Sequence, residues 1–210
     1  MAHHHHPHRF PFEKAHLLDD APRRARQPAE RLVEAMALEP SSVVIDFGAG
    51  TGYLTLPVAR KLEAMGGSGS VAAVDVEPRM LEVLAQRAGE LTKRISCANA
   101  LPVGTAIADR VLVVNLLHEL DRPVEIFRHI RALLRPGGWA LVSDWEPGGT
   151  AEIGPPPEVR LPVERAEEWL GAAGFGEVER LNLFEDFWTL RALTSAEFRS
   201  APRGTGRPLH

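Results

Sequence analysis

Two kinds of hydrophobic pattern alternate along the chain from residue 41 onward. Short runs that are almost continuously apolar are typical of strands buried on both faces of a parallel sheet. Longer segments in which apolar residues recur every three or four positions are typical of the helices that cover such a sheet. The predicted strands are residues 43–47, 71–76, 94–97, 111–117 and 139–143. The predicted helices are residues 53–65, 78–88, 123–134 and 162–173.

The two ends of the chain complete this prediction. A helix is expected at residues 28–38, and apolar runs at 178–183 and 187–193 are expected to pair antiparallel. The fold class is therefore α/β: a doubly wound, mostly parallel seven-stranded sheet with helices on both faces and an antiparallel C-terminal strand pair. We expect three parts. They are an N-terminal extension and cap helix (1–40), the core domain (41–199) and a loose tail (200–210).

Proline and glycine mark two boundaries within this pattern. Pro57 falls inside the predicted helix 53–65, so that helix either begins late or kinks there. The sequence Arg-Pro-Gly-Gly at residues 135–138 predicts a turn between a helix and the strand that follows.

Composition narrows the class of protein. The chain has 210 residues, 44% of them hydrophobic, and a formal net charge of −4. This charge offers nothing to attract nucleic acid or an anionic membrane. No apolar run approaches the roughly 20 residues needed to span a bilayer, and no hydrophobic leader is evident, so we expect a cytoplasmic protein. A single cysteine, Cys97, excludes an internal disulfide and a cysteine-only metal cluster.

The histidine-rich run at residues 3–8 has two interpretations. It is either the remnant of a purification tag or a native metal-binding tail. Apart from that run, no metal site is predicted.

A glycine-rich loop follows the first predicted strand. Its glycines are Gly48, Gly50 and Gly52, and Asp46 lies two positions before the first of them. Glycines at this place let a ligand approach the bare backbone at the carboxyl end of a strand. The dinucleotide fingerprint G-x-G-x-x-G would require glycine at position 53, where this chain has Tyr53.

This loop and the motifs after it resemble the class I S-adenosylmethionine-dependent methyltransferases, over residues 41–193 or so. The likeness is greatest to the branch that contains the quinone C-methylases and many small-molecule methyltransferases. The resemblance implies S-adenosylmethionine as cofactor and residues 41–199 as the methyltransferase core. It also implies that Asp46 holds the cofactor's ammonium group, and that the three glycines let its methionine end pack closely.

Two further cofactor contacts are implied by the resemblance. Asp75, at the end of the second predicted strand, would accept hydrogen bonds from the ribose hydroxyls; the alternative is an ordinary helix N-cap. Asn99 and Ala100, after the third predicted strand, would lie beside the adenine. The alternative for Asn99 is a turn-forming residue.

The end of the fourth predicted strand carries the remaining candidates. Asn115 interrupts an apolar run and is expected beside the methionine end of the cofactor. His118 is the candidate general base, because its unperturbed pKa lies near 6.5. Its alternatives are a cap for the following turn or a partner of Glu119. Weaker candidates for the base are Glu119, Asp144 and Glu146. Trp145 either flanks the acceptor as an aromatic wall or packs at the surface or in the core.

The sequence thus predicts methyl transfer to a small organic acceptor at O, C or N. It leaves open the identity of the acceptor, the use of a general base and the oligomeric state. The segments expected to cover the acceptor are residues 10–27 and 145–157. Two alternatives stand beside this prediction: a non-catalytic cofactor-binding or metal-binding regulatory protein on the same fold, and an NAD(P)-dependent oxidoreductase.

Overall fold

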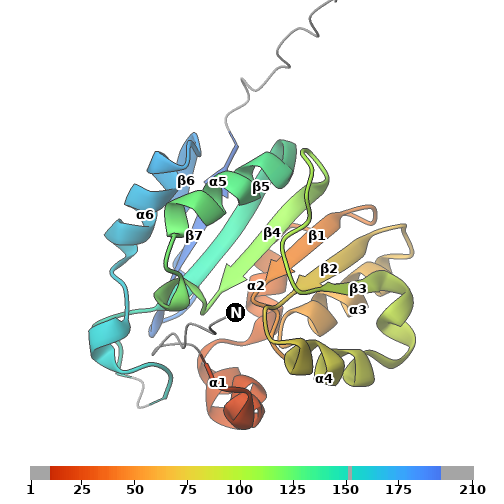
Figure 1. The fold of residues 1–210 in the computed structure, drawn as a ribbon, viewed down its shortest axis with the longest axis horizontal. Coiled ribbons are helices and arrows are strands. Elements are labelled where there is room, and N and C mark those ends of the chain that lie inside the picture. The colour runs from red at the N-terminus through yellow and green to blue at the C-terminus, as the bar shows by residue number, and fades with distance from the viewer. Residues whose placement is uncertain (1–9, 151–152, 195–210) are drawn as a thin grey trace, which may run out of the picture.

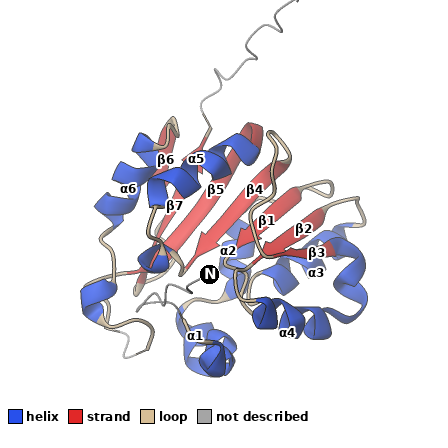
Figure 2. Cartoon of the chain, in the orientation of Figure 1, coloured by secondary structure: helices blue, strands red, loops and turns tan. Residues whose placement is uncertain are grey.

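The computed structural model describes residues 10–150 and 153–194, and it contains one seven-stranded sheet with helices on both faces (Figure 1, Figure 2). The strand order is β3-β2-β1-β4-β5-β7-β6. The strands are β1 Val43–Phe47, β2 Ser70–Val74, β3 Ile95–Ala98, β4 Ala108–Val114, β5 Leu134–Trp145, β6 Glu177–Arg180 and β7 Phe187–Leu193.

The pairing of these strands determines which strand ends lie together. The strands β1 to β5 pair parallel with their neighbours, and β7 runs antiparallel between β5 and β6. The carboxyl ends of β1, β2, β4 and β5 therefore meet at one edge of the sheet. The strand order reverses between β1 and β4, the switch point at which such sheets bind ligands. The predicted fold class is confirmed.

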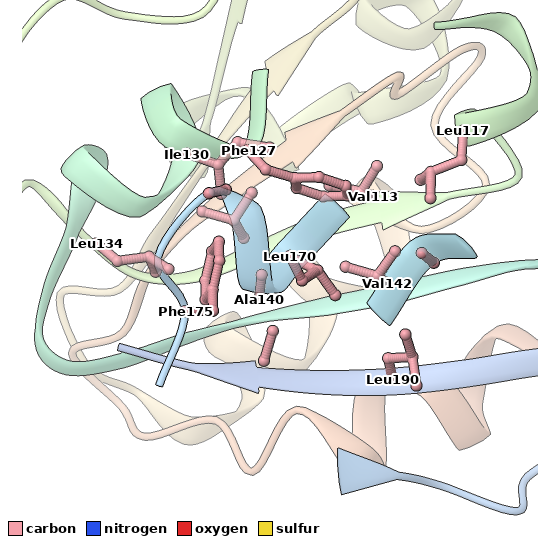
Figure 3. Packing of buried hydrophobic residues seen from close by; sticks show 14 of the residues in the cluster. Val113, Leu117, Phe127, Ile130, Leu134, Ala140, Val142, Leu170, Phe175 and Leu190 are labelled. Carbon is pink, nitrogen blue, oxygen red and sulfur yellow. The ribbon is translucent and has the colours of Figure 1, made fainter. Parts of the chain in front are cut away.

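Helices on each face bury separate apolar clusters. One face is covered by α2 (Ala29–Ala35), α3 (Thr55–Met65) and α4 (Pro78–Ala88). The other is covered by α5 (Pro123–Leu133) and α6 (Val163–Ala172). Figure 3 shows Phe127 and Ile130 of α5 and Leu170 of α6 packed over Val113 and Val142 of the sheet.

Short helical segments precede and connect these elements. Residues 10–27 contain the 3-10 helix η1 (Phe12–Asp19) and the helix α1 (Ala21–Arg26), where the sequence predicted no defined element. The other 3-10 helices are η2 Gly89–Arg94, η3 Leu117–Glu119 and η4 Pro157–Val159. In the part of the chain described, no helix combines the length and apolar character that crossing a bilayer requires.

Several predicted boundaries differ from those in the structure, and three positions have a clear local cause. The fourth strand ends at Val114 rather than residue 117, because Asn115 adopts a left-handed φ of +53° that leaves the extended conformation. The predicted turn at residues 135–138 lies inside β5 as an irregularity, since α5 ends at Leu133 and the chain enters the strand directly. The helix around Pro57 begins late, at Thr55, so the proline occupies its first turn without breaking it.

Two sequence predictions fall outside the described residues. They are the loose tail at 200–210 and the histidine run at 3–8. The division of the chain into 1–40, 41–199 and 200–210 stays a prediction.

Phe127 is expected to dominate the cluster under α5. It is fully buried and meets Phe175 edge-to-face, with ring centroids 6.4 Å apart. Phe127→Ala should lower the free energy of unfolding by about 3–5 kcal/mol, because it removes buried apolar contacts and leaves a cavity. Urea denaturation followed by circular dichroism measures this. Val103→Ala, at a residue that is 97% exposed, is the control and should change stability little. A loss of less than about 1 kcal/mol for Phe127→Ala would contradict this packing.

Candidate active site

Two adjoining cavities open at the carboxyl edge of the sheet. The His118 cavity, of about 580 Å³, is lined by residues that include Asp46, Tyr53, His118 and Trp145. The Asp75 cavity, of about 630 Å³, is lined by residues that include Asp75, Met80 and Ile126. The two share one wall, formed by Phe10, Leu18, Gly48, Gly50, Asn115 and Glu119. The sequence-predicted glycine loop therefore lies between them.

The glycine loop adopts a backbone that only glycine accommodates without strain. Gly48, Gly50 and Gly52 have φ of +82°, +51° and +92°. The amide of Gly48 donates to the carbonyl oxygen of Val74 at 2.8 Å, which ties the loop to the end of β2. A Cβ at Gly48 would lie 2.7 Å from Leu116 Cδ2. Gly48 and Gly50 therefore present bare backbone to both cavities, whereas Gly52 lines neither of them and lies against Leu56 and Leu84.

Asp75 faces this loop from the tip of β2. Its Oδ2 accepts from the amide of Gly50 at 2.8 Å, and its Oδ1 accepts from the amide of Glu77 at 3.0 Å. The residue that caps α4 is Glu77, whose carboxylate accepts from the amide of Arg79. The half-buried carboxylate of Asp75 thus connects the glycine loop with the Asp75 cavity.

Asp46 is a buried carboxylate on the other side of the loop. It is 3% exposed, and its Oδ2 accepts from Thr55 Oγ1 at 2.5 Å. Burial raises the pKa of Asp46 to about 6, against the opposing effect of the Thr55 hydrogen bond. The charge of Asp75 also raises this pKa, and that of Arg23 lowers it. A cation in the His118 cavity would favour the ionised form of Asp46.

Asn115 leaves one hydrogen-bonding atom without a protein partner. Its amide nitrogen Nδ2 donates to Gln27 Oε1 at 2.9 Å, whereas its buried Oδ1 accepts no hydrogen bond within the described residues. Gln27 is itself fully buried and donates through Nε2 to Ser143 Oγ at 3.2 Å. A buried acceptor without a partner is costly, so Asn115 Oδ1 needs a donor that the described residues do not supply.

His118 forms a pair with a carboxylate from the neighbouring strand. Its Nδ1 lies 2.9 Å from Oδ1 of Asp144, which is fully buried at the end of β5. Burial lowers the pKa of His118, but the hydrogen bond and charge of Asp144, together with Glu119, outweigh it and raise that pKa. Because the carboxylate needs a donor, Nδ1 carries the proton in the neutral ring and Nε2 is left as an acceptor.

The other candidates divide between the cavity walls and the surface. Trp145 lines the His118 cavity and packs on Phe187, with ring centroids 4.3 Å apart. Glu119 lines both cavities, and burial raises its pKa. Asn99 and Ala100 are exposed and line neither cavity, and Glu146 also lies outside the two linings.

Sequence reasoning expected residues 10–27 to cover the acceptor but singled out no residue within them. Leu18 lines both cavities, Arg23 lines the His118 cavity, and Gln27 orients Asn115. The one available signal was a run of polar residues ahead of the predicted helix 28–38, which carries no periodicity. Within the described residues, no three His, Cys, Asp or Glu side chains gather in a way that would hold a metal ion.

The donor set fits the cofactor that the sequence resemblance implies. S-adenosylmethionine has ribose hydroxyls and an ammonium group as donors. The site offers the carboxylates of Asp75 and Asp46 and the unpartnered Asn115 Oδ1 as acceptors. The backbone of Gly48 and Gly50 borders both cavities between these acceptors.

Comparison with known proteins finds similarity to methyltransferases. Residues 44–138 match a family model described as a methyltransferase domain. A malonyl-[acyl-carrier protein] O-methyltransferase of Marinomonas sp. (strain MWYL1) is 28% identical over 127 residues, which cover 59% of this chain and 46% of that protein. A protein arginine N-methyltransferase 7 of Oryza sativa subsp. japonica is 35% identical over 114 residues, which cover 52% of this chain and 14% of that protein.

The fold also matches a solved structure. The crystal structure of a SAM-dependent methyltransferase from Aquifex aeolicus superimposes with a TM-score of 0.79 and 22% identity, covering 89% of this chain and all of that one. The chain spans about half the length of the Marinomonas relative. Residues 44–138 therefore resemble a methyltransferase domain, and the chain shares the fold of a solved SAM-dependent methyltransferase.

Proposed function

We propose that this protein transfers the methyl group of S-adenosylmethionine to a small organic acceptor, at oxygen, carbon or nitrogen. The observation that carries the proposal is the glycine loop, whose left-handed backbone faces the Asp75 carboxylate where the two cavities adjoin. When bound, S-adenosylmethionine supplies a methyl group on a sulfonium, which needs orientation more than charge stabilisation.

The cofactor residues have distinct proposed roles. Asp75 accepts hydrogen bonds from the ribose hydroxyls, and Gly48 and Gly50 admit the methionine end to the backbone, whereas the sequence-based role of Gly52 in that contact gains no support from its place outside both cavities. Asp46 and Asn115 Oδ1 face the ammonium group from the His118 cavity. The sequence-based role of Asn99 and Ala100 beside the adenine gains no support from their exposed position. Apolar residues of the Asp75 cavity, such as Met80 and Ile126, are better placed for that contact.

His118 is the proposed general base for an acceptor that must lose a proton. Asp144 holds Nδ1 and thereby leaves Nε2 to take the proton from the acceptor. Asp144 is a positioning residue in this scheme, since its carboxylate is fully buried. Trp145 supplies an apolar wall beside His118 for the acceptor.

The choice of a small acceptor rests on charge and on the lining of the His118 cavity. A net charge of −4 gives nucleic acid no electrostatic attraction, and apolar side chains line much of that cavity. One relative is named for malonyl-[acyl-carrier protein] and another for protein arginine, so similarity alone does not choose among acceptors. The quinone C-methylase branch and a cytoplasmic location stay predictions from the sequence.

Titration calorimetry tests the cofactor class directly. S-adenosylmethionine and S-adenosylhomocysteine should bind, and NADH should not, because Tyr53 replaces the third glycine of the dinucleotide motif. Binding of NADH in place of S-adenosylmethionine would overturn the proposal. If S-adenosylmethionine binds but a broad acceptor screen releases no S-adenosylhomocysteine, the non-catalytic alternative gains support.

Asp75→Ala tests the ribose contact. The loss of hydrogen bonds to a charged group, each contributing about 1.5–3 kcal/mol, should weaken S-adenosylhomocysteine binding tenfold or more. Calorimetry gives the affinity, and thermal melting shows whether the glycine loop still folds. The matched control is Glu82→Ala, an exposed carboxylate of α4 outside both cavities, which should leave the affinity unchanged. Unchanged affinity in Asp75→Ala would refute the ribose role.

The pH dependence of the reaction tests His118. Because its pKa is raised and the base must be neutral, kcat/KM should increase with pH through a midpoint above 6.5, with an acceptor found by screening. His118→Gln should lower kcat by about 10²–10⁴-fold and abolish that rise, without weakening S-adenosylhomocysteine binding. Asp144→Asn should move the midpoint to lower pH. A profile that is identical in the wild type and His118→Gln would exclude base catalysis by this residue.

A further inference from the structure

The ring of His118 lies between two carboxylates. Asp144 Oδ1 is 2.9 Å from Nδ1 on one side, and Glu119 Oε1 is 3.8 Å from Nε2 on the other. The side chains of His118 and Glu119 are only 7% and 13% exposed. The distance to Asp144 is that of a hydrogen bond, whereas the distance to Glu119 is too long for one. Glu119 therefore acts on the imidazole through its charge, and Nε2 keeps its lone pair for an acceptor.

Residues 10–27, here called the N-terminal segment, reach Glu119 through their backbone. The amide of Phe10 donates a hydrogen bond to the Glu119 carboxylate, and both residues line the wall that the two cavities share. The other end of the segment is tied to the sheet, because Gln27 Nε2 donates to Ser143 Oγ at 3.2 Å. The N-terminal segment thus contacts the carboxylate that lies beside the candidate base.

The protonation state of Glu119 depends on this contact. Burial raises the pKa of Glu119, whereas the charge of His118 and the hydrogen bond from the Phe10 amide lower it. An ionised Glu119 stabilises a proton on His118, because opposite charges 3.8 Å apart attract. A protonated Glu119 would instead be a hydrogen-bond donor, and it would compete with the acceptor for Nε2. The Phe10 amide therefore favours the state of Glu119 that supports the base.

The other charged groups around this pair come from several elements. Those of the His118 cavity are Lys14, Asp20, Arg23 and Asp46. Those of the Asp75 cavity are Asp75, Glu77, Asp121, Arg122 and Glu125. The carboxylates that pair with His118 within the described residues are those of Asp144 and Glu119. The charges of Asp144 and Asp75 also act on Glu119, and both raise its pKa. The Phe10 amide opposes them.

We propose that Glu119 is a positioning residue for the base and that the Phe10 amide holds it as an anion, so that the N-terminal segment completes the base. The inference rests on the proposed function. In the reaction, the acceptor's proton moves to Nε2 of His118, and the electron pair left on the acceptor forms the bond to the methyl carbon. The electron pair of the broken carbon–sulfur bond stays on sulfur. The imidazolium lies between two carboxylates and later releases its proton to water, while Glu119 neither gains nor loses one.

The protonation of His118 tests the inference without an acceptor. A pH titration of the imidazole carbon–proton signals by nuclear magnetic resonance gives the pKa, and the spectrum of His118→Gln assigns the signal. Glu119→Gln keeps an oxygen for the Phe10 amide but removes the charge, so it should lower the pKa of His118 by about 1. Glu119→Asp should restore part of that change. An unchanged pKa in Glu119→Gln would overturn the inference. The matched control is Glu82→Gln on α4, outside both cavities, which should leave the pKa unchanged.

Two substitutions at one position isolate the amide. Phe10→Pro removes the N–H, and Phe10→Leu keeps it together with an apolar side chain. Phe10→Pro should lower the pKa of His118 by less than Glu119→Gln does, and Phe10→Leu should leave it unchanged. In a Glu119→Gln background, Phe10→Pro should have no further effect, because the charge that the amide holds is gone. An equal effect of Phe10→Pro in both backgrounds would show a general structural role and refute the inference.

Turnover separates this inference from the proposed function. With an acceptor found by screening, Glu119→Gln should move the midpoint of the rise in kcat/KM to lower pH, as it moves the pKa of His118. If the wild type binds neither S-adenosylmethionine nor S-adenosylhomocysteine, the proposed function fails, and the role of Glu119 in catalysis fails with it. If both bind and the pH profile of Glu119→Gln equals that of the wild type, this inference alone is overturned.

Discussion

The reversal of strand order between β1 and β4 is the constraint on which the rest of the structure depends. Connections leave β1 and β4 toward opposite faces of the sheet, so the connections that follow these two strands leave the edge between them open. The loop after β1 and the residues after β4 are therefore brought to one cavity wall, although 67 positions separate Gly48 from Asn115 (115 − 48). Every proposed contact with the cofactor is arranged around that opening.

Burial decides the chemistry available at this edge. A carboxylate placed among apolar residues needs partners, and Asp46 and Asp144 obtain theirs differently. Asp46 receives a hydroxyl hydrogen bond from Thr55, and its pKa is raised to about 6. Asp144 is bonded to His118, whose pKa is raised in turn. One carboxylate is thus available to a cationic ligand, and the other is committed to orienting an imidazole.

Residues 10–27 complete the wall of the two cavities at the carboxyl ends of the strands. Buried Gln27 connects Asn115 to Ser143 of the neighbouring strand, and Arg23 adds a positive charge to the His118 cavity. These polar contacts and the Arg26–Asp186 ion pair tie residues 10–27 to the rest of the chain. The stability of this segment is consequently coupled to the hydrogen bonds made in the cavity.

The sequence by itself determined the strand and helix pattern, the glycine loop and the carboxylate of Asp75, because each depends on residues close together in the chain. It misplaced the end of β4, since the left-handed backbone of Asn115 is not visible in an apolar run. Only the tertiary structure decided that His118 pairs with Asp144, that Gln27 and Arg23 enter the site, and that Asn99 and Ala100 stay exposed. These outcomes depend on contacts across 26 to 88 positions of the chain, which local propensity does not encode.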